Sequence, residues 1–260
     1  WSIAWRNEVE SCLKQLRDKC RELQESAQTI GPLLGFGTGD WSERDLRALN
    51  SVSKFLLNSP AIPAAMVTAP DWNASCSLLT ELIKSGSKRD SLRDQLYQRY
   101  TPKLLQLDLD GLQKQLVDGE NSWFLPRAIS QWKVKKSLQR VTQPGQMVEP
   151  SSMLDDIKTA RDLQDEQKRL DQAGDRAREL LGQLWQDGEA DWKVIAKIRD
   201  ATSTLCTLAE QVAETDNARA LALRQQWSRL VDEEHEQLSA DGTIGRLLQD
   251  YINKAEAFIS

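Results

Sequence analysis

The sequence holds one histidine and four cysteines, the residue types that most often act as metal ligands, bases or nucleophiles. His235 stands among Glu233, Glu234 and Glu236, and there is no second histidine for a His-x-x-x-His pair. The cysteines are scattered and form no Cys-x-x-Cys pair: Cys12, Cys20, Cys76 and Cys206. We therefore predict no metal site and no catalytic residue. His235 is expected on a solvated helix face, and the cysteines as small, buried, reduced residues of a cytoplasmic protein.

A glycine-rich run, residues 35–39, looks superficially like a phosphate-binding loop. A P-loop ends in Lys followed by Ser or Thr and comes after an apolar strand, and neither feature is present here. Asp40, the next residue, would also repel a phosphate. We predict an interhelical turn at this run, and no cofactor in this segment.

One stretch of the chain has a strong chemical bias: residues 121–148 contain no Asp or Glu. Five cations lie in it: Arg127, Lys133, Lys135, Lys136 and Arg140. Three aromatic residues are interleaved with them: Trp123, Phe124 and Trp132. Such side chains can bind phosphates and stack on bases, or they can contact an acidic protein partner. A basic helix that buries its tryptophans would have the same composition, so nucleic acid, a protein partner and a structural role all stay open.

The bulk composition favours helices with one buried stripe and a wide solvated face. The 260 residues are 40% apolar and 28% charged, and the net charge is −5. No apolar run approaches the ~20 residues that cross a bilayer, and no signal-peptide pattern opens the chain, so we expect no membrane partner. Because the first residue is Trp1 rather than Met, we expect the chain to be a segment of a longer protein.

The N-terminal segment predicts a coiled-coil helix. Apolar residues recur with the alternating four- and three-residue spacing of a heptad seam: Val9, Leu13, Leu16, Cys20, Leu23, Ala27 and Ile30. Gly31-Pro32 should end this helix, because proline cannot continue it. A stripe this narrow leaves leucines in water unless another helix covers it, so we expect a partner helix, with self-association through residues 9–30 as one possibility.

Three later helices are predicted to begin with the same dipeptide: Asp40-Trp41, Asp71-Trp72 and Asp191-Trp192. In each, the Asp oxygen can accept from the free N–H groups of the first turn, and the Trp covers the start of the helix. Repeated use of one start signal favours repeated helical hairpins. Ser85-Gly86-Ser87 is interpreted as a turn, and the helix that begins at Trp192 is expected to run to about Leu238.

Two blocks of the sequence resemble a known family. Ser122-Trp123-Phe124-Leu125-Pro126, followed by Trp132 and the basic run to Arg140, resembles one block, and Leu180 to Trp192 (LLGQLWQDGEADW) resembles a second. Together with the leucine-rich segment from Tyr100 to Leu116, they resemble the long helical insertion of large bacterial superfamily I helicase-like ATPases. The resemblance covers about Tyr100 to Leu208, and Phe124 stands where a second Trp is common in that family.

The resemblance implies a non-catalytic arm or stalk of a nucleic-acid-dependent ATPase, with the ATP-binding motifs outside this chain. Its partners would be the remainder of the parent motor protein and nucleic acid or a further protein. The two ends would lie close together, with Val9–Ile30 and the apolar face of Ile244–Phe258 as candidates for an antiparallel pair at the base of the stalk. The alternative is a stand-alone helical adaptor or oligomerisation module, in which the N-terminal seam pairs between chains.

The predicted fold is therefore all-α: an elongated helical bundle with an antiparallel coiled-coil stalk and repeated Asp-Trp-started hairpins. We expect an N-terminal coiled-coil helix in residues 1–31, a hairpin region in residues 32–145 and a long-helix region with a C-terminal amphipathic helix in residues 146–260. The basic aromatic segment, residues 121–148, begins in the second of these. Structural anchors are predicted at four tryptophans and three leucines: Trp41, Trp72, Trp185, Trp192, Leu13, Leu16 and Leu23.

Overall fold

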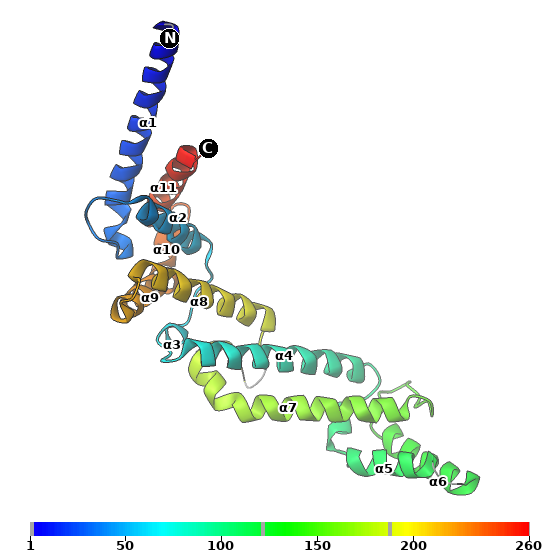
Figure 1. Ribbon diagram of the computed structural model, residues 1–260. Coiled ribbons are helices and arrows are strands. Elements are labelled where there is room, and N and C mark those ends of the chain that lie inside the picture. The colour runs from blue at the N-terminus through cyan, green and yellow to red at the C-terminus, as the bar shows by residue number, and fades with distance from the viewer. Residues whose placement is uncertain (1–2, 121–122, 187–188, 260) are drawn as a thin grey trace. The chain divides into compact units, whose positions relative to one another are not determined.

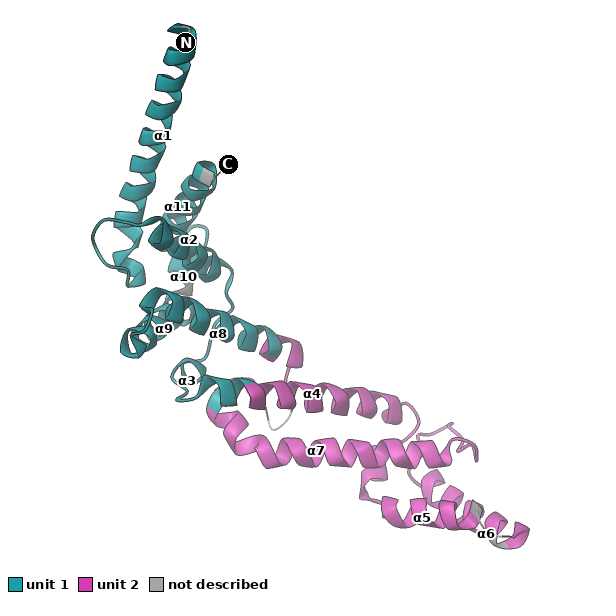
Figure 2. Ribbon diagram, in the orientation of Figure 1, with its two compact units in different colours: residues 1–76, 180–182, 196–260 teal, residues 77–179, 183–195 magenta. Residues whose placement is uncertain are grey.

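The computed structural model describes residues 3–120, 123–186 and 189–259, and these residues form α-helices and short 3₁₀ helices with no β-strand (Figure 1). The all-α prediction is confirmed. None of the helices in the described ranges is long and apolar enough to cross a membrane. The chain divides into two compact units, coloured separately in Figure 2: unit 1 is residues 1–76, 180–182 and 196–260, and unit 2 is residues 77–179 and 183–195.

Unit 1 is built from both ends of the chain. Its elements are α1 (Ile3–Ile30), η1 (Pro32–Leu34), α2 (Glu43–Asn58), α3 (Ala64–Val67), the start of α4 (Trp72–Tyr97), most of α8 (Trp192–Ala213), α9 (Asn217–Asp232), α10 (His235–Leu238) and α11 (Thr243–Ile259). Trp227 and Tyr251 are the largest side chains of its core, and both are fully buried. Their polar atoms are satisfied, since Trp227 Nε1 donates to the Leu34 carbonyl (2.9 Å) and Tyr251 Oη donates to the Leu46 carbonyl (2.8 Å).

The C-terminal half of α1 packs antiparallel against α11. Lys19 Nζ donates to the Ala257 carbonyl (2.9 Å), and Lys254 Nζ donates to Ser26 Oγ (2.8 Å), so the two helices run in opposite directions. This packing buries the second half of the predicted seam: Leu23, Ala27 and Ile30. The helix ends at Ile30, as the Gly31-Pro32 pair predicts.

The predicted helix starts are correct at two of three places. Asp71 accepts from the N–H of Ala74 (3.0 Å) at α4, and Asp191 accepts from the N–H of Val194 (3.1 Å) at α8. The prediction that Asp40 caps α2 is wrong. Ser42 is the N-cap there, because it forms a reciprocal capping box in which its Oγ accepts from the Asp45 N–H and Asp45 accepts from the Ser42 N–H.

Two further expectations are also wrong. Residues 85–87 form no turn, because α4 continues through them to Tyr97. The long helix expected from Trp192 to Leu238 is interrupted after Ala213, where Glu214 takes a left-handed conformation (φ 60°). Asp216 then caps the separate helix α9 by accepting from the Arg219 N–H (2.9 Å).

Unit 2 consists of helical segments from the middle of the chain. Its elements are most of α4, η2 (Pro102–Gln106), α5 (Leu109–Glu120), α6 (Phe124–Gln139), most of α7 (Met153–Leu181), η3 (Gly182–Leu184) and the first residues of α8. An ion pair joins α4 to α7: the buried Glu166 accepts through Oε1 from Nζ of the exposed Lys88 (2.8 Å). Burial alone would raise the pKa of Glu166, but hydrogen bonds from Lys88 and Ser85 hold that pKa below its usual value. This carboxylate therefore stays ionised between the two helices.

Candidate interaction surface

The inner face of α6 is fixed against α5. Val134 and Leu138 of α6 are fully buried and share one apolar core with Leu112 and Leu116 of α5. The two helices approach closely at Gly119, where an added Cβ would lie 3.0 Å from Ser130 Cβ. This packing decides which face of α6 is turned outward.

The C-terminal end of α6 is held by the segment that follows α4. The Thr101 N–H donates to the Val141 carbonyl (2.7 Å), and the Gln143 N–H donates to the Arg99 carbonyl (2.8 Å). Below them, the buried Asp156 of α7 accepts from Tyr100 Oη (2.8 Å) and pairs with Arg99. Burial, together with this hydrogen bond, raises the pKa of Tyr100 above its usual value, so the phenol keeps its proton and its bond. Both the side and the end of α6 are thus anchored.

The outer face of α6 is apolar and aromatic near its start. The side chain of Trp123 is 76% exposed and that of Trp132 is 60% exposed. Leu125, Ile129 and Trp132 lie four and three residues apart, so they share one stripe of the helix. Phe124 is exposed beside them. Leu125 and Ile129 were not predicted as part of a binding surface, although their helical spacing from Trp132 places them on one face with it.

Cations continue this face toward the end of the helix. Lys133, Lys136 and Arg140 are exposed there, whereas Lys135 is half-buried. Arg127 is also exposed, but it lies in the first turn of α6, seven residues before the buried Val134, and so is not on the stripe of Leu125, Ile129 and Trp132. Lys136 Nζ lies over the ring of Trp132, 4.9 Å from its centroid. In the part of the chain that the structure describes, none of the five cations forms an ion pair with a carboxylate. We call the outer face of residues 123–140 the α6 face; it presents exposed rings beside positive charge that pairs with no carboxylate among the described residues. Ser122 lies outside the described residues.

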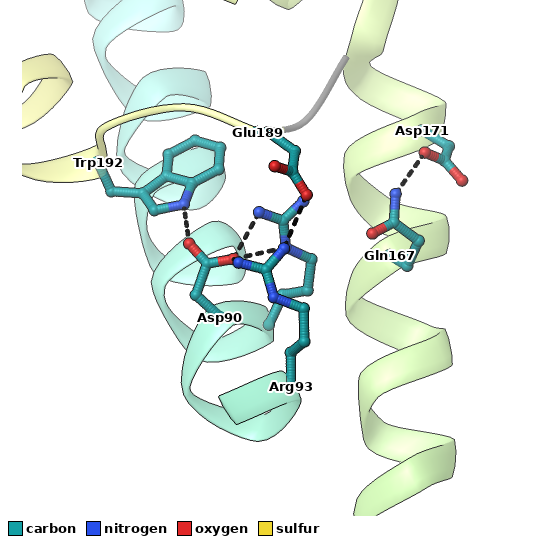
Figure 3. Close-up of polar contacts among 7 residues, drawn as sticks. Asp90, Arg93, Gln167, Asp171, Glu189 and Trp192 are labelled. Atoms are coloured by element: carbon teal, nitrogen blue, oxygen red, sulfur yellow. Dashed lines mark hydrogen bonds and ion pairs between the residues drawn. The ribbon is translucent and has the colours of Figure 1, made fainter. Parts of the chain in front are cut away.

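The tryptophans of the second Trp-rich block, residues 180–192, are buried, unlike those of the α6 face. Trp185 and Trp192 are each 6% exposed and meet edge to face, with ring centroids 6.1 Å apart. Trp192 Nε1 donates to Asp90 Oδ2 (2.8 Å) on α4, and Figure 3 shows that carboxylate between the indole and the guanidinium of Arg93. Arg93 also pairs with Glu189 (2.8 Å). Trp192, Asp90, Arg93 and Glu189 are thus connected by hydrogen bonds and ion pairs, so the block is a structural joint within unit 2.

Gly86 explains why the predicted turn is helical. A Cβ at this position would lie 2.1 Å from the Trp192 ring, so only glycine lets the indole approach α4 this closely. The Arg89 guanidinium lies 5.9 Å from the centroid of the same ring. The glycine in Ser85-Gly86-Ser87 therefore serves a close approach, and the helix continues through it.

The two remaining predicted tryptophan anchors lie in unit 1 and are half-buried. The ring of Trp41 packs on Gly31, where a Cβ would come within 2.3 Å of it, and lies 6.0 Å from the Phe36 ring. Trp72 Nε1 donates to Ser203 Oγ (3.2 Å) on α8. Of the three predicted leucine anchors, Leu23 is buried, whereas Leu13 and Leu16 are exposed.

Within the described residues, no group of three or more His, Cys, Asp or Glu side chains is placed to hold a metal ion. The side chain of His235 lies outside the described part. All four cysteines are described and none forms a disulfide, but only Cys206 is buried, and burial raises the pKa of its thiol to about 11. The expectation that all four are buried is wrong, because Cys12 stands on the exposed part of α1. The glycine-rich run lies between η1 and α2, as predicted.

Comparison of the chain with protein-family models, with curated proteins and with solved structures found no match.

Proposed function

We propose that this chain is a non-catalytic helical arm of a larger bacterial, cytoplasmic, nucleic-acid-dependent ATPase, and that its α6 face binds single-stranded nucleic acid. The observation that carries the proposal is the combination of exposed Trp123 and Trp132 with cations that pair with no carboxylate among the described residues. Cations bind phosphates with release of counterions, and exposed rings stack on bases. The parent ATPase is inferred from the sequence resemblance alone.

A single strand fits the α6 face better than a duplex. The rings of Trp123, Phe124 and Trp132 are exposed on a helix whose other side is buried. Such rings can stack only on bases that are themselves unstacked, and duplex bases are not. Lys136 covers one side of the Trp132 ring, and its charge adds a phosphate contact beside a stacked base.

A second candidate ligand is a protein with an acidic rim around an apolar centre. Leu125 and Ile129 favour it, because aliphatic side chains contribute little to base stacking but pack well against another protein. An oligonucleotide distinguishes the two candidates. If the α6 face binds nucleic acid, the chain binds the oligonucleotide, and charge reversal or added salt lowers its affinity. If the face binds an acidic protein instead, these effects are not expected.

The experiment measures the affinity of the chain for a fluorescent oligothymidylate of about 20 nucleotides at low salt, a length that spans the face with room to spare. The double variant Lys133→Glu with Lys136→Glu should weaken binding at least about tenfold, because two phosphate contacts become repulsions. The matched control is Lys158→Glu with Lys168→Glu, two exposed lysines of α7, which changes the net charge equally.

The control variant should bind within about threefold of the original chain, since only the long-range field changes. Equal losses in the two variants would show that general charge, and not the α6 face, holds the strand. No binding by the unaltered chain would reject nucleic acid as the ligand of this face.

A further inference from the structure

The N-terminal half of α1 carries an apolar seam that no helix covers in the described structure. Figure 1 shows α1 extending past the end of α11, and Lys19 already lies beside Ala257, close to the last residue of that helix. Before this point the side chains of Leu13 and Leu16 are 56% and 48% exposed. They continue the stripe that α11 buries at Leu23 and Ala27, so the uncovered seam is continuous with an existing helix–helix interface.

An apolar groove lies next to the point where that interface ends. It has a volume of about 420 Å³ and lies between α1, α2 and α11, lined mainly by Leu23, Leu46, Tyr251, Ala255 and Phe258. Leu23 belongs both to the groove and to the seam. If another helix packs along the uncovered seam, the end of that helix nearest Leu23 therefore reaches the groove.

We propose that α1 pairs antiparallel with α1 of a second copy of this chain. In the heptad register of the seam, Leu13 then faces the partner's Leu16, and Val9 faces the partner's Cys20. These layers bury leucines that are otherwise in water, which is the main driving force of such a pair.

Charge sets the direction of the pairing. Glu10 and Arg17 flank the seam on the same side, one heptad apart. In the antiparallel register Glu10 faces the partner's Arg17, and by two-fold symmetry the reciprocal pair also forms. A parallel pair would instead bring Cys12 beside the partner's Arg17, and Lys19 beside the partner's Gln24, with no opposite charges. The flanking residues therefore favour the antiparallel arrangement.

The same register accounts for the groove. With Leu13 opposite the partner's Leu16, Arg6 faces the partner's Leu23, and the exposed side chain of Trp5, one residue before Arg6, lies next to that layer. An indole has the size and apolar character that such a groove accepts. Each copy would thus place one tryptophan into the groove of the other, and both grooves are filled by symmetry.

Sedimentation equilibrium of the purified chain, without nucleic acid, tests the proposal. A dimer is expected at tens of micromolar, and Leu13→Asp with Leu16→Asp should weaken it by roughly a hundredfold or more. Both leucines are exposed in the single chain, so helix content measured by circular dichroism should not fall. Charge reversal by Glu10→Lys alone should also weaken the dimer, and Glu10→Lys with Arg17→Glu should restore it.

Cysteine cross-linking tests the direction independently. In the background Cys12→Ser, the variant Val9→Cys should form a disulfide with the partner's Cys20, identified by mass spectrometry of the linked peptides. A link from Cys20 to the partner's Cys20 would mean a parallel pair and would overturn the register. A chain that sediments as a monomer, or a dimer that the leucine variant leaves intact, would overturn the proposal itself. None of these outcomes bears on the α6 face, so the two proposals fail separately.

Discussion

Two tryptophans of unit 2 differ in how far the fold buries them: Trp192, the first residue of α8, is buried, and Trp132, in the middle of α6, is exposed. Trp192 is 6% exposed, its Nε1 is bonded to Asp90, and Gly86 makes room for its ring. Trp132 is 60% exposed, and Lys136 lies over one side of its ring. The difference indicates that the first tryptophan holds the fold together and that the second is available to a ligand.

Of the substitutions that test this difference, the replacement of Trp192 should change the free energy of unfolding most. Trp192→Ala removes a ring packed on Gly86, Trp185 and Arg89 and leaves a cavity, so it should lower the free energy of unfolding by about 3–5 kcal/mol. Urea unfolding followed by circular dichroism measures this change. A loss below about 1 kcal/mol would mean that this cluster is not the joint described above.

The addition of a single methyl group at Gly86 should cause the second-largest loss of unfolding free energy. Gly86→Ala places a Cβ 2.1 Å from a rigid ring, and the resulting displacement should cost about 2–3 kcal/mol of unfolding free energy. The matched control is Gly174→Ala, in the interior of α7, where a Cβ meets nothing within 4 Å. That variant should stabilise the chain by up to about 1 kcal/mol, because alanine favours a helix. The same sign for both substitutions would contradict the close-approach role of Gly86.

Replacing Trp132 should have the smallest effect on stability. Trp132→Ala removes an exposed side chain, so the free energy of unfolding should change by no more than about 0.5 kcal/mol. The same variant should weaken oligonucleotide binding by about tenfold, since one stacking platform is lost. A large loss of stability would place Trp132 with Trp192 among the structural tryptophans.

The sequence predicts much of this molecule but not which face of α6 is free. Val134, Leu138 and Val141 have the same four- and three-residue spacing as Leu125, Ile129 and Trp132. Periodicity therefore predicts an apolar stripe on each of two faces, and only the packing against α5 decides which is buried. The basic, acid-free character of the segment, by contrast, could be recognised directly from its residues.

Local signals were correct where nothing distant competed with them. Asp71, Asp191 and Gly31-Pro32 mark helix ends because their effects act within one turn. The turn predicted at Gly86 is wrong because the reason for this glycine is its contact with Trp192, which is more than a hundred residues away in the sequence. The interruption after Ala213 was missed although Asp216 carries the usual N-cap signal.

The central claim is that cations of the α6 face bind the phosphates of a single strand, and the salt dependence of binding tests it most directly. For the unaltered chain, the logarithm of the oligonucleotide affinity should fall linearly with the logarithm of salt concentration. In Lys133→Gln with Lys136→Gln the slope should be shallower by about 1.4, because each lost phosphate contact removes about 0.7. Equal slopes for the two proteins, or binding that salt does not weaken, would contradict the account.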